Sequence, residues 1–357
     1  MKTILHVIDT TGPGGAETVF INLADKIREQ GYRCIALIRG KGWVYDELQR
    51  RRIETVVLDC KGSFNLSFLR QLIKLIKKEQ VDIIQSHLLG SNIYCAMAGI
   101  LARKPVFATF HGAVDVANKE RFLKLKCFIL NRGVRQFITV SETLKDEIQS
   151  SGLLDSKKTT VIYNGIDPSN YYRRDSSDLR QRLKLSKEKK LIGSLGNIRP
   201  AKAYSVLVKA AAIVTKVDPN LHFVIAGDTS RSNLMDELNQ LATSLDVQSN
   251  VHFIGYQNNS ASFLGKLDAF LLTSSSEGFS IATIEALATG LPVIATKCGG
   301  PEEILKGSAQ EELAEVNDES SIARSVLKAL NSPKAPFEFT FSLSNSVQKY
   351  LMIYTEK

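Results

Sequence analysis

Two glutamates in the stretch EGFSIATIE are the residues of this sequence whose type and spacing most directly suggest chemistry. Glu277 and Glu285 lie eight positions apart, with no ionisable residue between them. We expect a turn at Glu277 and a helix from Ser280 to Ala288, so a rise of about 1.5 Å per residue separates the two backbones by on the order of 8–12 Å. Retaining glycosidases hold their two carboxyl groups at about 5 Å, and inverting ones at up to about 9.5 Å. The spacing therefore favours two groups that bind different parts of an extended ligand.

Glycine-rich turns before two expected helices have a backbone suited to anions. One turn contains Gly14 and Gly15, and the other contains Gly278, Phe279 and Ser280. Free N–H groups at a helix start, together with the helix dipole, favour a phosphate or a hydroxyl there. The first turn does not match G-x-G-x-x-G, and no acidic residue ends the next strand, so a dinucleotide-binding dehydrogenase is disfavoured. A turn without a ligand is the alternative.

Two cations precede a long expected helix in GNIRPAKAYSVLVKA. Arg199 and Lys202 oppose the dipole of that helix, which is unfavourable unless an anion lies between them. Because arginine and lysine both suit phosphate, the pattern favours a phosphate site over its alternative, a solvated basic turn.

Two histidines end strands in the first half of the chain, His87 in IIQSH and His111 in ATFHG. At the carboxyl end of a parallel strand, each is expected to point toward a ligand rather than into the core. There it could bind a sugar hydroxyl or accept a proton. A structural role is the alternative for each, and it is the role expected for His6, His222 and His252.

These residues are positioned by a repeated alternation of strands and helices. Apolar, β-branched runs such as TILHVI, RCIALI and PVFATFHG alternate with amphipathic stretches, and the alternation restarts with KLIGSLGN, LHFVIAGD and AFLLTS. Continuous apolar strands between helices indicate parallel sheets that are covered on both faces. The predicted fold class is α/β, with two doubly wound, Rossmann-like parallel-sheet domains that face each other across a cleft.

A composition shift near Pro168 suggests the domain boundary, because a Ser/Asp/Arg-rich run follows it. We predict an N-terminal domain at residues 1–170 and a linker at residues 171–187. A C-terminal domain is predicted at residues 188–340, followed by a last amphipathic helix at residues 341–357.

The composition is that of a soluble globular protein. The 357 residues are 44% hydrophobic and 23% charged, and no run reaches the about 18 apolar residues of a transmembrane helix. The first residues, MKTILHVIDTTG, do not resemble a signal peptide, so a cytoplasmic location is predicted. Five cysteines without a C-x-x-C pair argue against a disulfide framework or a zinc site.

The positive charge is concentrated in the first half of the chain. Residues 1–173 contain 26 Lys and Arg against 17 Asp and Glu, a net of +9, whereas residues 174–357 contain 20 of each. This asymmetry suggests an anionic partner such as a phospholipid surface or a lipid diphosphate, with solubility alone as the alternative. Nucleic acid is disfavoured because no stacking or groove-reading motif is present.

The segment KERFLKLKCFILNR, residues 119–132, combines this charge with apolar residues. Arg121, Lys124 and Arg132 are expected along one helical stripe. The interleaved apolar residues are Phe122, Leu125, Phe128 and Ile129. Such a mixture suits an anionic membrane surface, so peripheral association is predicted. A packed helix with a solvated basic edge is the alternative.

Taken together, these motifs resemble the retaining glycosyltransferases of family GT4, which have the GT-B fold. The strongest element is SEGFSIATIEALATGLPVIATKCGGPEEI, which is similar to the E-x7-E motif of that family with its trailing G-x-P-V and G-G-x-x-E. GGAE, FHG, VSE, YNGID, GNIRPAK and FIGY support it, so the resemblance covers nearly the whole chain.

The resemblance implies that the C-terminal domain binds a nucleoside diphosphate sugar and that the last helix, residues 341–357, packs back on the N-terminal domain. Glu277 would bind hydroxyls of the donor sugar, and Glu285 would bind the ribose hydroxyls. The backbone at Gly278, Phe279 and Ser280 would contact the sugar and the phosphates.

The resemblance also implies roles near the reacting groups. Lys202 matches the phosphate-binding lysine, and Gly15, with Gly14 beside it, matches the N-terminal loop next to the diphosphate. His111 matches the histidine near the reacting sugar, and Tyr256 falls where the base lies. With Glu277, Lys202 and His111 form the expected catalytic set.

Other positions depart from the family pattern or belong to the acceptor. The family often has arginine where this chain has Asn197, and Arg199 is expected to supply the missing charge beside the donor. Glu17 and His87 are assigned to the acceptor side, in the domain that resembles the acceptor-binding half.

The activity that the resemblance implies is transfer of a hexosyl or N-acetylhexosaminyl group, with retention, to a lipid-linked or oligosaccharide acceptor in bacterial surface polysaccharide synthesis. No cofactor and no metal ion are expected, since no Asp-x-Asp motif lies where it would hold one. The location implied is the inner face of the plasma membrane. Two alternatives stay open, a nucleotide-sugar epimerase of the same fold and a non-catalytic protein that binds nucleotide sugars or glycans.

Overall fold

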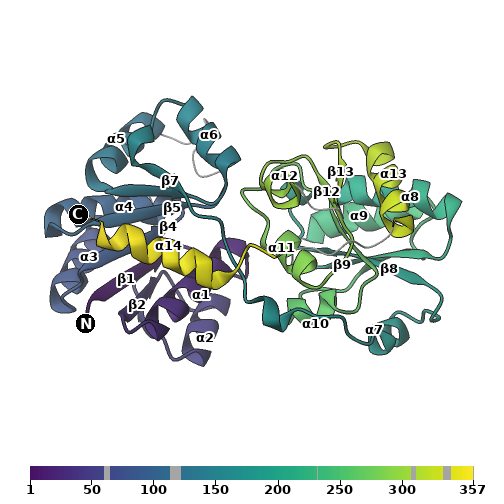
Figure 1. The fold of residues 1–357 in the computed structure, drawn as a ribbon, viewed down its shortest axis with the longest axis horizontal. Coiled ribbons are helices and arrows are strands. Elements are labelled where there is room, and N and C mark those ends of the chain that lie inside the picture. Colours follow the sequence, from purple (N-terminus) through teal and green to yellow (C-terminus); the bar gives the residue numbers. More distant parts are fainter. Residues whose placement is uncertain (60–64, 113–121, 231, 307–310, 333–338, 357) are drawn as a thin grey trace. The chain divides into compact units, whose positions relative to one another are not determined.

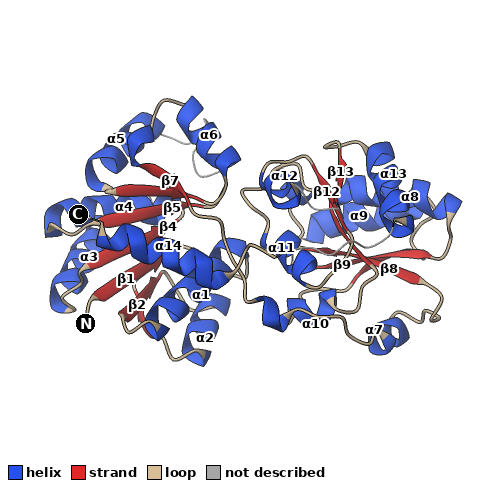
Figure 2. Ribbon diagram, viewed as in Figure 1, coloured by secondary structure: helices blue, strands red, loops and turns tan. Residues whose placement is uncertain are grey.

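The structure is a computed structural model that describes residues 1–59, 65–112, 122–230, 232–306, 311–332 and 339–356 (Figure 1). The chain divides into two compact units. Met1–Gly165 and Leu343–Lys357 form the N-terminal unit, and Ile166–Ser342 form the C-terminal unit. Each unit contains a sheet flanked by helices, as the colours of Figure 2 show.

The sheet of the N-terminal unit has seven described strands in the order β3-β2-β1-β4-β5-β6-β7, and all its pairs are parallel. These strands are β1 (Thr3–Ile8), β2 (Arg33–Ile38), β3 (Glu54–Val57), β4 (Ile83–His87), β5 (Val106–Phe110), β6 (Gln136–Thr139) and β7 (Thr159–Val161). All six residues of β1 are buried, as expected for a strand covered on both faces. Burial lowers the pKa of His6, inside β1, to about 3, in keeping with a structural role.

Six helices connect these strands among the described residues, and a seventh ends the chain. The connecting helices are α1 (Gly15–Glu29), α2 (Trp43–Arg50), α3 (Leu66–Lys78), α4 (Leu89–Ala102), α5 (Leu123–Gly133) and α6 (Glu142–Ser150), and the last is α14 (Leu343–Thr355). Side-chain caps define two of the starts: Asn65 accepts from the N–H of Phe68, and Ser141 accepts from the N–H of Leu144.

Alternation along β1 assigns helices to the two faces of this sheet. Ile4 and Ile8 belong to apolar clusters that include residues of α1. Val7 projects to the opposite face, because successive side chains of a strand point to opposite sides. It lines a cavity together with residues of α3, α4 and α5.

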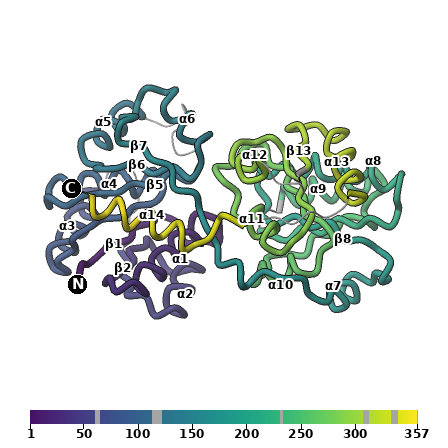
Figure 3. Tube along the Cα trace, viewed as in Figure 1, coloured from purple at the N-terminus to yellow at the C-terminus, as the bar shows by residue number. Residues whose placement is uncertain are grey.

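The C-terminal helix α14 packs within the N-terminal unit. Figure 3 shows this yellow helix, which contacts α1. Tyr350 and Tyr354 are buried in one cluster with Ile4. Their hydroxyls reach the sheet, since Tyr354 Oη donates to Gln85 Oε1 at 2.8 Å and Tyr350 Oη lies 3.2 Å from Thr109 Oγ1. The helix therefore completes the core of the first sheet although it ends the chain.

The C-terminal unit has a second parallel sheet, with six described strands in the order β10-β9-β8-β11-β12-β13. Its strands are β8 (Lys190–Leu195), β9 (Leu221–Ala226), β10 (Val251–Phe253), β11 (Ala269–Leu272), β12 (Val293–Thr296) and β13 (Glu311–Ala314). Its α-helices are α7 (Ser177–Arg182), α8 (Tyr204–Val217), α9 (Ser232–Ser244), α10 (Ser260–Leu264), α11 (Ile281–Ala288), α12 (Gly300–Leu305) and α13 (Glu319–Asn331). Leu207 of α8, Phe223 of β9 and Val326 of α13 share its main core cluster.

The prediction of two Rossmann-like parallel α/β units is confirmed, but the predicted linker is wrong. Residues 171–187 belong to the C-terminal unit, and the chain passes between the units at Gly165–Ile166 and again at Ser342–Leu343. Helix α7 occupies the middle of the predicted linker, where Arg180 Nη2 pairs with Asp268 Oδ2 at 3.2 Å. Leu179 is buried there, so a sequence that reads as polar still contributes to the core.

Among the described helices, none combines the length and the apolar character that crossing a membrane requires.

Candidate active site

The central contact of the C-terminal unit is an ion pair between two residues that lie 75 positions apart. Lys202 ends the short 3-10 turn Pro200–Lys202 after β8, and Glu277 lies in the turn between β11 and α11. Lys202 Nζ lies 2.7 Å from Glu277 Oε1, and their side chains are only 21% and 14% exposed. Ser274 Oγ donates to the same carboxylate oxygen at 2.6 Å. The two catalytic residues expected in this unit therefore form one preorganised group.

Electrostatics keep Lys202 charged despite its burial. Burial disfavours the ammonium form, but the negative charge of Glu277 and the neighbouring Tyr204 outweigh it, so the pKa of Lys202 lies above its ordinary value. Glu277 therefore neutralises a cation that a bound anion could also neutralise. Removing one partner of such a buried pair would leave the other uncompensated.

Backbone contacts fix the turn that carries Glu277. Its N–H donates to the carbonyl of Cys298 at 2.9 Å, and its carbonyl accepts from the N–H of Gly300 at 3.2 Å. Gly300 is required by this close approach, because a Cβ there would lie 2.4 Å from Phe279 Cα. Ser280 has a φ of 70°, a conformation that is strained for a non-glycine residue and is found at functional sites. Helix α11 begins after it, at Ile281, one residue later than expected.

Glu285 lies on α11 as a separate buried carboxylate, 6% exposed. Its Oε1 accepts from Tyr171 Oη at 2.7 Å and from Ser260 Oγ at 3.1 Å. Burial raises the pKa of Glu285 to about 7, although both of these hydrogen bonds lower it. Within the described part of the chain, no hydrogen bond reaches Oε2, so this oxygen can accept from the hydroxyls of a ligand.

The remaining residues expected at the donor occupy different surroundings. Asn197 Oδ1 accepts from the N–H of Asp228 at 3.1 Å, so this side chain supports the loop after β9. Arg199 is exposed, and its carbonyl accepts from the N–H of Lys202 at 3.0 Å; within the described residues, no hydrogen bond or ion pair joins its side chain to Lys202. Tyr256 is 39% exposed, so part of its surface is open to solvent.

In the N-terminal unit, helix α1 begins at Gly15, within the Gly14–Gly15 turn. A Cβ on Gly14 would lie 2.3 Å from Glu17 Oε2, so the side chain of Glu17 folds back onto the turn. Glu17 is buried. Its carboxylate is therefore placed at the positive end of α1, where carboxylates are stabilised.

The two histidines at strand ends contact each other. His87 Nδ1 lies 2.9 Å from His111 Nε2, and their rings stack with centroids 5.2 Å apart. Burial lowers the pKa of His111 to about 4, and it lowers the pKa of His87 well below its usual range. Both rings are therefore neutral near pH 7. The expectation that His87 points out of the core is wrong, because its side chain has no exposed surface and packs edge-on against Phe20.

The hydrogen-bond network assigns the tautomers of this pair. His87 Nε2 is buried and has no partner among the described residues. An unpaired buried N–H is rarer than an unpaired acceptor, so the proton of His87 belongs on Nδ1, from which it is donated to His111 Nε2. His111 then carries its own proton on Nδ1 and acts as a hydrogen-bond donor at this atom.

A second pair of the same kind lies in the C-terminal unit. His222 Nδ1 is 3.1 Å from His252 Nε2, and the rings stack with centroids 5.3 Å apart. Both residues were expected to be structural, and they lie at the amino ends of β9 and β10, away from the strand ends that carry the site.

The sequence did not indicate which residues donate hydrogen bonds to the carboxylates of Glu277 and Glu285. Tyr171 fell in the predicted linker, and Ser260 and Ser274 belong to no recognised motif. A buried carboxylate needs hydroxyl or N–H donors, but nothing in the sequence says which of many serines and tyrosines provide them.

Comparison with family models and curated proteins finds glycosyltransferases. The family model for glycosyl transferases group 1 matches residues 175–340, and that for Glycosyltransferase Family 4 matches residues 13–170. The N-acetyl-alpha-D-glucosaminyl L-malate synthase of Bacillus anthracis is 28% identical over 92% of this chain and 88% of its own length. The UDP-Gal:alpha-D-GlcNAc-diphosphoundecaprenol alpha-1,3-galactosyltransferase of Escherichia coli is 27% identical over 74% of this chain and 70% of its own.

Solved structures show the same fold. A glycosyltransferase from Rickettsia africae matches with a TM-score of 0.85 and 24% identity, over 99% of this chain and 97% of that one. Anabaena Alr3699/HepE, crystallised with UDP and glucose, also matches with a TM-score of 0.85, at 21% identity and over 99% of both chains. With both family models matched in sequence order on two parallel-sheet units, the chain belongs to the family 4 glycosyltransferases of the GT-B fold.

Proposed function

We propose that this glycosyltransferase moves a sugar from a nucleoside diphosphate sugar to an acceptor hydroxyl with retention at the anomeric carbon. The observation that carries the proposal is the buried contact between Lys202 and Glu277, which sets one cation beside one carboxylate. A leaving diphosphate gains negative charge as the glycosidic bond breaks, and a fixed cation stabilises that charge. The carboxylate of Glu277 is suited to accept hydrogen bonds from the hydroxyls of the sugar that is transferred.

The second carboxylate extends this site. Oε2 of Glu285 is the oxygen that we assign to the ribose hydroxyls, with Tyr256 beside the base. In the N-terminal unit, the Nδ1–H of neutral His111 is a donor for a sugar hydroxyl, and the Gly14–Gly15 turn offers N–H groups to the phosphates. Arg199 adds charge for the phosphates once its exposed side chain turns toward them. We propose no metal ion or cofactor for this chemistry.

Front-face attack suits this arrangement better than a covalent intermediate. Neither carboxylate is free to act as a nucleophile, because Glu277 is paired with Lys202 and Oε1 of Glu285 is held by two hydroxyl groups. In this mechanism the acceptor oxygen attacks on the face that the diphosphate leaves. A phosphate oxygen of the leaving group takes the acceptor proton, so no protein base is needed.

The relatives support an acceptor on a lipid carrier in surface polysaccharide synthesis. One is named for transfer to a sugar on diphosphoundecaprenol, and others are named for lipopolysaccharide core and capsular polysaccharide synthesis. We place the protein in the cytoplasm at the inner face of the plasma membrane.

The surface of α5 fits that location. Leu125 and Phe128 are 51% and 57% exposed, and Phe122, just before the helix, is 59% exposed. Lys124 and Arg132 lie on the same helix, with the guanidinium of Arg132 5.4 Å from the centre of the Phe128 ring. Apolar and basic residues together suit anionic headgroups. The first part of the predicted stripe, residues 119–121 with Arg121, lies outside the described residues.

A nucleotide-release screen tests the proposal. Purified protein is incubated with UDP-, GDP- and ADP-sugars, with and without lipid-linked acceptors, and products are identified by mass spectrometry. We expect one nucleoside diphosphate to be released faster when acceptor is present. Conversion of the donor into an isomer without release would instead identify an epimerase, and tight donor binding with no release would identify a non-catalytic binding protein.

A further inference from the structure

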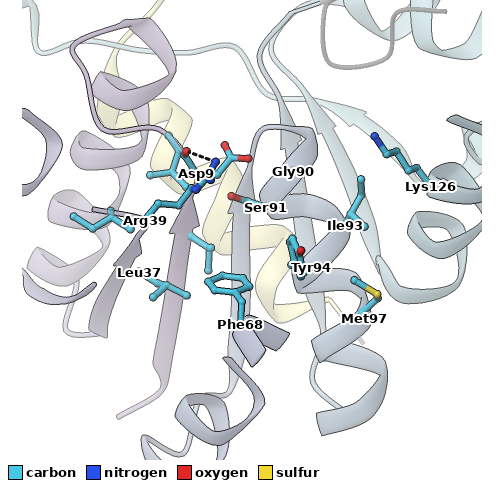
Figure 4. A pocket seen from close by; sticks show the side chains of 13 residues that line it. Asp9, Leu37, Arg39, Phe68, Gly90, Ser91, Ile93, Tyr94, Met97 and Lys126 are labelled. Atoms are coloured by element: carbon cyan, nitrogen blue, oxygen red, sulfur yellow. Dashed lines mark hydrogen bonds between the residues drawn. The ribbon is translucent and has the colours of Figure 1, made fainter. Parts of the chain in front are cut away.

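The N-terminal unit contains a cavity of about 210 Å³ that none of the roles assigned above uses (Figure 4). It lies at the carboxyl ends of β1 and β2, on the face of the sheet covered by α3, α4 and α5. Complete ligand sites measure about 300–1,000 Å³. This cavity therefore suits one part of a larger molecule.

One end of the cavity is apolar. Leu37 and Phe68 are buried in its wall, and Met97 of α4 is half-buried beside them. Tyr94 presents its ring, since it stacks edge-on with Phe68 at 4.9 Å and its hydroxyl accepts from the N–H of Asn65 at 2.6 Å. A sugar ring placed here would lose hydrogen bonds to water without replacing them, whereas a hydrocarbon chain would lose none.

The other end is charged. Asp9, Arg39 and Lys126 line it, and Figure 4 shows Arg39 directed at the backbone of Asp9, where Nη1 lies 3.5 Å from the carbonyl oxygen. The carboxylate of Asp9 lies close to the backbone at the start of α4. A Cβ on Gly90 would lie only 2.0 Å from Asp9 Oδ2. Among the described residues that line this end, two are cations and one is an anion, so their side chains together are net positive, which favours an anionic group.

The helices that line the cavity also carry the exposed apolar surface of this unit. Met97 is followed one turn later on α4 by Ile100 and Leu101, which are exposed. Lys126 is flanked on α5 by Leu125 and Phe128. The cavity and these exposed apolar residues therefore share two helices, α4 and α5, which contact each other.

We propose that this cavity binds the first part of a prenyl-type hydrocarbon chain, with the phosphate attached to that chain lying between Arg39 and Lys126. The inference rests on the proposed function, because the hydrocarbon chain would belong to the lipid carrier of the acceptor. It goes beyond that function by assigning the hydrocarbon a site within the N-terminal unit. With such a site, the enzyme would select acceptors by their hydrocarbon chain as well as by their sugar.

Methionine NMR tests this directly, because the chain has only four methionines. With ¹³C-methyl-methionine label, the Met97→Leu variant assigns the signal of Met97, and Met235 and Met352 report on other parts of the molecule. Farnesyl phosphate is the probe, inorganic pyrophosphate supplies charge without a chain, and octyl glucoside supplies a chain without charge. We expect farnesyl phosphate to shift Met97 at micromolar concentration and to leave Met352 unchanged.

Matched variants separate the two ends of the cavity. Met97→Trp fills the apolar end and should weaken binding of farnesyl phosphate at least tenfold, whereas Met352→Trp, on the exposed face of α14, should not. Lys126→Ala should weaken it several-fold, and Lys74→Ala, an exposed lysine of α3, should not. Circular dichroism confirms that each variant is folded.

Three results would overturn the proposal: no shift of Met97 with farnesyl phosphate, an equal shift with octyl glucoside, or an equal loss in Met97→Trp and Met352→Trp. Nucleotide release from the donor is measured on the same samples. Release with an unmoved Met97 signal would reject the chain site and leave the glycosyltransferase proposal intact. A Met97 shift without release from any donor would support the chain site and reject the proposed transfer.

Discussion

The two units use the same kind of parallel sheet but place different chemistry at the carboxyl ends of its strands. In the C-terminal unit these ends carry charge: the Lys202–Glu277 pair and the Glu285 carboxylate, each held by side chains from distant parts of the sequence. In the N-terminal unit they carry the neutral pair of His87 and His111. The strand ends of the C-terminal unit thus carry buried charge, whereas β4 and β5 of the N-terminal unit end in neutral rings and its charged residues Asp9 and Arg39 follow β1 and β2.

The net charge is distributed differently from the charged groups at the strand ends. The excess of +9 lies entirely in residues 1–173, whereas the rest of the chain is neutral overall. The basic residues of α5 lie on a surface that also exposes Leu125 and Phe128. The net charge of a unit thus indicates which charged partners its surface attracts, and it says little about the charged groups inside its binding site.

The largest effect should come from removing the cation of the charged site. Lys202→Ala should lower kcat/KM for transfer by about 10²–10³-fold, as loss of a fixed charge-stabilising donor does. It should also lower the free energy of unfolding by about 3 kcal/mol, because the buried carboxylate of Glu277 loses its counter-ion. Steady-state nucleotide release and urea unfolding measure the two.

Lys266→Ala is the matched control for this experiment. It removes another lysine of the C-terminal unit from an ion pair, with Asp178, which is 67% exposed. Such pairs contribute about 0–1 kcal/mol, so both readouts should stay near those of the wild type. Nearly unchanged transfer in Lys202→Ala would refute the role of the charged site.

The second effect is a pH dependence that belongs to Glu285. Its pKa in the folded protein is about 7, and the ionised carboxylate is a stronger acceptor for the hydroxyls of a nucleotide than the protonated carboxyl. Nucleotide affinity should therefore fall as pH drops below 7, by up to about 30-fold between pH 8.5 and 5.5, since each unit below the pKa costs at most about tenfold. Calorimetric titration of the donor nucleotide across this range measures it, and Glu285→Gln should abolish the dependence.

The same group has a signature in stability. A carboxyl whose pKa is raised on folding contributes stability that is present below its unfolded value, 4.5, and is lost as pH rises through 7. Glu285→Gln should therefore unfold at a higher temperature than wild type at pH 8 and show a smaller difference at pH 4.5. An equal difference at both pH values would place the pKa elsewhere.

A smaller effect is expected from the neutral site. His111→Ala removes one hydrogen-bond donor and should lower kcat/KM about tenfold, as the loss of one such bond does. His252→Ala removes the corresponding ring of the other histidine pair and should leave kcat/KM unchanged. Because His111 is neutral above its pKa of about 4, the profile of the wild type should show no histidine titration near pH 6.5. A titration near pH 6.5 in the kcat/KM profile of the wild type that disappears in His111→Ala would contradict the conclusion that His111 is neutral at this pH.

The smallest effect on the donor reaction should come from α5. Leu125→Ser with Phe128→Ser should leave nucleotide release and stability nearly unchanged, within about 0.5 kcal/mol for each surface change. Binding to anionic vesicles in a flotation assay should fall markedly. Val217→Ser, at an exposed apolar position of the C-terminal unit, should leave flotation unchanged, and a wild-type protein that does not float would refute the membrane proposal.

The sequence predicted the architecture because apolar, β-branched strands between amphipathic helices leave few other folds. It also indicated Glu277, Lys202 and Glu285 as functional residue types. It could not predict that Lys202 and Glu277 touch, since contact across 75 residues depends on how neighbouring strand ends align.

The errors have local causes. Tyr171 was missed because a Pro-, Ser- and Arg-rich run reads as a linker, although its hydroxyl reaches Glu285, 114 residues away. His87 was expected to be exposed because it ends a strand. Alternation decides which face such a residue points to, and the neighbours that bury it, Phe20 among them, come from another helix.

Nuclear magnetic resonance of one complete reaction tests the central claim most directly. An α-linked nucleotide sugar is supplied with a lipid-linked acceptor, and the anomeric proton of the transferred sugar is followed with the released nucleotide. We expect an α-linked product formed in step with nucleoside diphosphate, and formation of both about 10²–10³-fold slower in Lys202→Ala. A β-linked product would contradict retention, and an isomerised donor with no nucleotide released would contradict transfer itself.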